Sequence, residues 1–121
     1  MPEQRGAQHH RERMADAIRD EIVAILEGEL ADPRVGLATV SEVRLAPDGK
    51  SAHVLVAVPG DEKEAERTLQ GLEAAKGFIR HEIMERLRLR RAPELFFQLD
   101  RSQEYGDRID DLLKRVKKKE K

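Results

Sequence analysis

The chain has 121 residues, a length that supports one domain with a modest core and is too short for two. It contains no cysteine, which excludes disulfide bonds and thiolate metal sites, and no apolar run approaches the roughly 20 residues of a membrane helix. The formal net charge of −1 excludes little, because the charges are unevenly placed: residues 76–91 hold six bases and two acids.

The N-terminus is charged rather than apolar, which argues against a secretory signal, so we expect a soluble, cytoplasmic protein. Residues 1–8 are polar, contain Pro2 and Gly6, and are expected to form a flexible tail. A helical period then starts at Arg11. The helix is expected to end at Asp32-Pro33, because the residue before proline is disfavoured in the α region. Its apolar stripe comprises Met14, Ile18, Ile22, Ile25, Leu26 and Leu30.

Two strands follow, over residues 37–45 and 52–58, because both stretches alternate and are rich in β-branched residues. Pro47-Asp48-Gly49 between them predicts the turn of a hairpin. Helical spacing returns over residues 62–75 and, beyond a glycine at position 77, continues toward residue 89. A glycine inside a helix costs about 1 kcal/mol relative to alanine, so a bend or a close backbone approach is expected there.

Pro93 ends the third helix, and alternation over residues 95–99 predicts a third strand. Ser102 is expected near the start of a last helix that contains Ile109, Leu112, Leu113 and Val116. Three strands cannot cover an apolar face alone, so the order of elements predicts a two-layer α+β domain with the helices on one side of the sheet. The helix ends in a basic tail, residues 114–121, which either binds RNA or keeps a frayed end soluble.

The basic segment around the third helix is the strongest functional signal. Arginine offers a planar fork that matches phosphate oxygens and stacks on unpaired bases. The alternative is intramolecular pairing with Glu82, Glu85 and the acidic side chains of the first helix. Gly77 is likewise open to two interpretations, a packing accommodation or exposed N–H groups at a new helix N-terminus. The candidate RNA-binding residues are Lys76, Gly77, Arg80, Arg86, Arg88, Arg90 and Arg91.

Other residue patterns give little support for an enzyme. His9 and His10 lie in or beside the expected tail, and His53 and His81 lie on separate elements, so the four histidines form no site. No nucleophilic triad or phosphate-binding glycine loop is present, so no catalytic residue, metal or cofactor is expected. Phe78 and Phe97 are expected in the core, and Phe96 on the opposite strand face with partial burial. Scarce aromatics favour recognition of phosphates and shape over recognition of base sequence.

Five short segments in chain order resemble the ribosome-binding factor A family, over about residues 11–113. Each segment is weak alone, but the ordered set is specific. The segments are Asp32-Pro33-Arg34-Val35-Gly36, Ala46-Pro47-Asp48, Ala75-Lys76-Gly77-Phe78-Ile79-Arg80, residues 87–97, and Arg108-Ile109-Asp110-Asp111-Leu112-Leu113.

The resemblance implies a KH-like domain of type II topology over residues 9–113, in which Ala75-Lys76-Gly77 replaces the Gly-x-x-Gly loop of other KH modules. It implies a non-enzymatic, monomeric bacterial factor that binds ribosomal RNA of the immature 30S subunit, assists 16S rRNA processing and maturation, and is associated with growth in the cold. Two alternatives stay open: a KH-like module with another nucleic-acid target, and a protein-interaction adaptor that uses the first helix and the hairpin.

Overall fold

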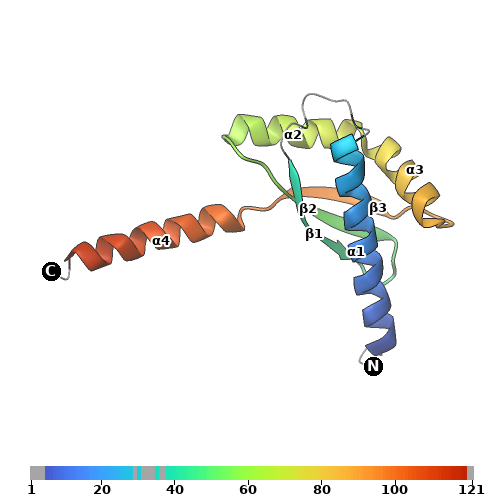
Figure 1. Cartoon of the computed structure of the whole chain (residues 1–121), viewed down its shortest axis with the longest axis horizontal. Helices are drawn as coiled ribbons and strands as arrows, with labels where there is room; N and C mark the ends of the chain where they lie inside the picture. The colour runs from blue at the N-terminus through green and yellow to red at the C-terminus, as the bar shows by residue number, and fades with distance from the viewer. Residues whose placement is uncertain (1–4, 29, 31–34, 36–37, 120–121) are drawn as a thin grey trace.

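The computed structural model describes residues 5–28, 30, 35 and 38–119, with side chains outside the description at positions 5, 103–107 and 117–119 (Figure 1). The helix end predicted at Asp32-Pro33, most of the motif at positions 32–36 and the first four residues of the predicted tail lie outside the described residues. The elements follow in the predicted order: α1 (Arg5–Gly28), β1 (Thr39–Leu45), β2 (Ser51–Ala57), α2 (Glu62–Ala74), α3 (Lys76–Leu87), β3 (Glu94–Leu99) and α4 (Ser102–Lys119).

Helix α1 (Arg5–Gly28) begins earlier than the start predicted near Arg11. Its apolar stripe is the predicted one, since the side chains of Ile18, Ile22 and Ile25 are at most 1% exposed. The helix lies across β1 and packs against both β1 and α3 (Figure 1). The buried stripe of this long, otherwise charged helix therefore forms one side of the core.

The three strands form a mixed sheet in the order β1-β2-β3. Strands β1 (Thr39–Leu45) and β2 (Ser51–Ala57) form the predicted antiparallel hairpin, with an irregularity between Val40 and Glu42. At the turn, Gly49 has φ +72°, which glycine adopts without steric cost. Strand β3 (Glu94–Leu99) pairs with β2 in parallel, so α2 and α3 form the crossover between them.

The core lies between one face of this sheet and the helices. Ala52, Val54 and Val56 of β2 and Leu95 of β3 are fully buried, and they alternate with outward residues as a half-covered sheet requires. Helix α2 (Glu62–Ala74) contributes Leu72, while α3 (Lys76–Leu87) contributes Ile79 and Ile83. The predicted two-layer α+β arrangement is confirmed for α1, α2 and α3.

Helix α4 (Ser102–Lys119) differs from the expectation that all helices stack on the sheet. It projects away from the rest of the molecule, as Figure 1 shows. The predicted stripe of Ile109, Leu112, Leu113 and Val116 is helical but 40–59% exposed. Its start is fixed locally, since the Asp100 carboxylate accepts the Ser102 N–H at 3.0 Å and Arg101 pairs with Glu62 of α2.

Candidate nucleic-acid interface

The predicted kink is a single residue. Ala75 is both the C-cap of α2 and the N-cap of α3, with φ −91° and ψ 0°. Its N–H donates to Gly71 O at 3.1 Å, and its carbonyl accepts Ile79 N–H at 2.9 Å. Alanine has no side-chain acceptor, and α3 accordingly has no side-chain cap at its N-terminus. The first N–H groups of α3 therefore carry the partial positive charge of a helix start without a side-chain capping oxygen.

Gly77 lies in the first turn of α3, and its surroundings separate its two interpretations. A Cβ placed on Gly77 would meet no atom within 4 Å, apart from chain neighbours and the backbone of its own helix, and its φ is not positive. Neither close packing nor backbone conformation within the described residues thus requires glycine. What glycine supplies here is bare backbone on an exposed surface, which a ligand can approach closely.

Lys76 lies beside the kink and is held in place from two sides. Its Nζ is 2.9 Å from Glu73 Oε2 and 5.9 Å from the centroid of the Phe96 ring. The Phe96 ring in turn stacks on His53, with centroids 5.2 Å apart. Lys76 is therefore a partly neutralised cation at the edge of the sheet face that the helices leave uncovered.

Arg80 stabilises the fold. Its Nε and Nη2 donate to the carbonyl oxygens of Pro93 and Ala92, both at 3.1 Å, in a partly buried position. These two bonds join α3 to the loop that leads into β3. Because these carbonyls accept two of its five N–H groups, Arg80 holds the loop in position.

Arg86 also has intramolecular partners. Its Nε donates to Glu82 Oε2 and its Nη1 to Glu21 Oε2, both at 3.3 Å, and its side chain is 25% exposed. The sequence left intramolecular pairing open as the alternative to phosphate contact. In the structure, Arg86 makes such pairs, with Glu82 and with an acid of the first helix. Arg86 therefore ties α3 to α1.

Arg88 occupies an unusual backbone conformation. It is the C-cap of α3 with φ 53° and ψ 47°, the only described non-glycine residue with positive φ. The left-handed region costs a non-glycine residue about 1–2 kcal/mol, and glycine is the usual occupant of this place after a helix. The exposed arginine side chain is thus kept at a position where glycine would be more stable.

Arg90 and Arg91 follow in the loop 88–93, and both side chains are exposed. Within the described part of the chain, the side chains of Arg88, Arg90 and Arg91 make no hydrogen bond or ion pair. They form a local group of three unpaired guanidinium groups, which we call the loop arginines. The seven predicted residues hence fall into three sets: Lys76 and Gly77 in the first turn of α3, Arg80 and Arg86 further along it, and the loop arginines after it.

Two exposed aromatic side chains add to this surface. Phe78, adjacent to Gly77, is 42% exposed, so the prediction that it lies in the core is wrong. Ile79 and Ile83 already fill the buried stripe of α3, and Phe78 falls beside that stripe. Phe96 is 43% exposed, whereas Phe97 packs against the core as predicted.

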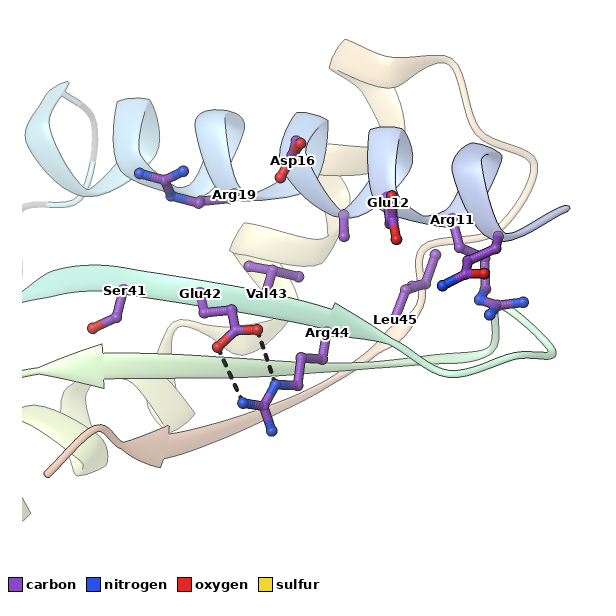
Figure 2. A pocket seen from close by; sticks show the side chains of 11 residues that line it. Arg11, Glu12, Asp16, Arg19, Ser41, Glu42, Val43, Arg44 and Leu45 are labelled. Atoms are coloured by element: carbon purple, nitrogen blue, oxygen red, sulfur yellow. Dashed lines mark hydrogen bonds and ion pairs between the residues drawn. The ribbon is translucent and has the colours of Figure 1, made fainter. Parts of the chain in front are cut away.

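A groove of about 350 Å³ between α1 and β1 is a competing surface (Figure 2). Its charges are balanced, with Arg11, Arg19 and Arg44 facing Glu12, Asp16 and Glu42. Arg44 donates to both Glu42 carboxylate oxygens at 3.0 and 3.2 Å, and this hydrogen bond, with the carboxylate charge, raises the pKa of Arg44. A balanced groove suits a polyanion less well than the loop arginines do.

The described residues contain no group of three potential ligands arranged to hold a metal ion. Of the helices in this part of the chain, none has the length and apolarity to cross a membrane.

Comparison with known proteins adds independent evidence. Residues 10–113 match the family model described as ribosome-binding factor A. The chain is 64% identical to ribosome-binding factor A of Koribacter versatilis (strain Ellin345) over 119 residues, which cover 98% of this chain and 97% of that protein.

Solved structures agree in fold. The crystal structure of ribosome-binding factor A from Thermus thermophilus is 34% identical, with a TM-score of 0.58 over 78% of this chain and 96% of that one. A homology model of the Thermus thermophilus protein, fitted into a cryo-EM map of a 30S complex, gives a TM-score of 0.56 at 34% identity over 78% and 94% of the two chains. The predicted α+β fold class is thereby confirmed.

Proposed function

The chain belongs to the ribosome-binding factor A family, and we propose that it binds the small ribosomal subunit through α3 and the loop arginines as a non-enzymatic maturation factor. The Thermus thermophilus relative, whose homology model has been fitted into the map of a 30S complex, supports this partner. Such a factor works where ribosomes are assembled, in the cytoplasm. The 16S rRNA of the immature 30S particle is the ligand that fits a cationic surface.

The main evidence for this surface lies at the two ends of α3. At each end, a different residue would give a more stable fold. Gly77 stands where alanine would stabilise the helix, and Arg88 stands where glycine would remove strain. Neither residue has a described intramolecular contact that explains the choice. Binding of a ligand at both ends of the helix explains both.

The geometry suits a phosphate backbone. A helix of this length, Lys76–Leu87, spans about 18 Å at 1.5 Å per residue. The uncapped N–H groups with Lys76 at one end and the loop arginines at the other would contact separate phosphates of one RNA segment. Arg80 and Arg86 would act indirectly, by holding the loop and α3 in place.

Maturation requires no covalent step in this proposal. A protein that binds two RNA arrangements with unequal affinity shifts their equilibrium by that difference alone. Contacts to phosphates and RNA shape at fixed spacing across α3 supply such a difference. The proposed role in 16S rRNA processing is therefore to favour the arrangement that later steps accept.

Co-sedimentation with purified 30S subunits tests the surface. A variant with Arg88, Arg90 and Arg91 changed to glutamate should lose most of its 30S association, because three phosphate contacts become repulsive. The matched control changes three exposed arginines elsewhere, Arg13, Arg19 and Arg67, with the same change in net charge. Equal association of the loop variant and the wild type would refute the assignment, and equal sedimentation with 50S subunits would refute the choice of partner.

A further inference from the structure

A second groove of about 320 Å³ lies next to the loop arginines. It is formed by the first half of α1, the turn between β1 and β2, and the loop between α3 and β3, so Arg91 belongs both to its rim and to the proposed RNA surface. We call it the turn groove. Its lining includes Arg11, Met14, Leu45, Leu89 and Arg91.

The floor of the turn groove is apolar. Ile18 is 1% exposed, and Met14, Leu45 and Leu89 are partly buried against the core. Pro93, also buried, forms part of the wall. The groove in Figure 2 differs, because it is lined mainly by charged side chains although it shares Arg11 and Leu45. Of the two grooves, the turn groove therefore offers the apolar floor on which a flat apolar group can lie.

The rim of the turn groove is positively charged. Its charged residues are Arg11, Arg91 and a single acid, Asp48. The Asp48 Oδ1 atom already accepts the Lys50 N–H at 2.9 Å, which holds the turn. The arrangement suits a ligand with an apolar, planar part and an anionic part.

We propose that the turn groove binds one unpaired nucleotide of the RNA, with its base on the apolar floor and its phosphate at Arg91 and Arg11. This proposal rests on the function proposed above. The volume is at the lower end of the roughly 300–1,000 Å³ of small-ligand sites, which fits one nucleotide. Unpaired bases can leave the stack and lie on apolar or guanidinium surfaces, whereas paired bases cannot.

The charge of Arg91 and the position of the turn groove beside the loop arginines indicate which ligand the groove binds. An apolar peptide would leave the guanidinium of Arg91 without an anionic partner. RNA that contacts Arg88 and Arg90 passes directly beside the groove, since Arg91 is the next residue along the loop. The turn groove therefore extends the phosphate surface by one base-binding position.

The test uses the full chain with methyl-labelled methionine and a short single-stranded RNA of mixed sequence, beside a duplex of the same length. The Met14 methyl signal should shift with the single strand and not with the duplex. Met14→Glu should weaken single-strand binding about tenfold, the effect expected for loss of one stacked base. Leu26→Glu, a change to the same residue at a partly buried position of α1 outside the groove, should leave binding unchanged.

Unfolding of either variant is checked by circular dichroism, and the methyl shifts of the wild type serve as the readout that does not depend on a variant. An unshifted Met14 signal on binding of single-stranded RNA, or an equal shift with duplex, overturns the proposal. If 30S association persists in that case, only the groove assignment fails. If the loop variant loses 30S association while the Met14 signal of the wild type stays unshifted, the proposed phosphate surface is supported and the proposed base site is refuted.

Discussion

The guanidinium Nη1 of Arg86 lies 3.3 Å from Glu21 Oε2, which joins α3 to α1 across 65 positions of sequence. The same guanidinium donates to Glu82 one turn earlier on α3. Two carboxylates of different helices therefore share one arginine in a partly buried place. This contact orients the helix whose two ends we assign to RNA binding.

Arg86→Ala should lower the free energy of unfolding by about 1 kcal/mol, because it removes the charged hydrogen bonds and leaves Glu21 and Glu82 with uncompensated like charges. Urea unfolding measures the loss. Arg13→Ala, at an exposed position of α1, should stay within about 0.5 kcal/mol of the wild type. Equal losses in the two variants would contradict the structural role of Arg86.

Arg80→Ala should destabilise the fold by about 1–3 kcal/mol, since the carbonyls of Ala92 and Pro93 lose their donors in a partly buried loop. Thermal unfolding gives the magnitude. The folded fraction of the variant should still bind 30S subunits through the loop arginines. A stable variant that fails to bind would instead assign Arg80 to direct RNA contact.

Gly77→Ala should act in opposite directions on stability and binding. The new methyl group has open space and replaces a flexible residue in a helix, so stability should rise by about 0.4–1 kcal/mol. The same methyl group covers the backbone surface offered to RNA, so 30S association should fall. Gly6→Ala on α1, where a Cβ also meets nothing, is the matched control and should leave association unchanged. A rise in stability with undiminished binding would show that Gly77 does not contact RNA.

Arg88→Gly should likewise stabilise the protein, by about 1 kcal/mol, because glycine adopts φ 53° without strain. Its 30S association should decrease through loss of one phosphate contact, and the salt dependence of binding should become shallower. Arg88→Lys separates the effects, since it keeps the charge and the strain. If the glycine variant binds as tightly as the wild type at every salt concentration, Arg88 is not a phosphate contact.

The start of α4 should respond to acid. Hydrogen bonds from the Ser102 side chain and backbone, and then from Ser41, lower the pKa of Asp100 below its ordinary value of 3.8. The stability that the Asp100 contacts give to the start of α4 is thus fully present above the ordinary pKa. It is lost as the pH falls through the lower pKa that Asp100 has in the folded protein. The protection factor of the Ser102 amide against exchange should therefore fall in that window, and Asp100→Asn should remove this pH dependence. A Ser102 amide that exchanges alike in the two proteins across the window would refute the cap.

Local sequence patterns predicted most of the fold. Alternation and Pro47-Asp48-Gly49 predicted the hairpin, because both signals act over a few residues. A bend was predicted at Gly77 from a single glycine in a helical pattern, and the structure places the break two residues earlier, at Ala75. These features depend on short-range sterics, which the sequence displays directly.

The different roles of the arginines could not be predicted in the same way. Arg80 reaches carbonyls of a loop twelve or more positions away, and Arg86 reaches an acid on another helix. Such partners depend on how helices pack, which periodicity does not specify. Phe78 was assigned to the core for the same reason: hydrophobicity indicates burial on average, while the rotation of α3 decides which apolar residue is left outside.

The parallel pairing of β2 with β3 has a consequence for synthesis. A chain emerges from its N-terminus, so the hairpin can form while residues 58–93 are still being made, and the far edge of β2 has no neighbour during that time. Closing a long segment is slow compared with closing a tight turn. Partial chains that end before position 94 should therefore expose an unpaired edge of β2 to chaperones. Once β3 has been made, it pairs with this edge and covers it.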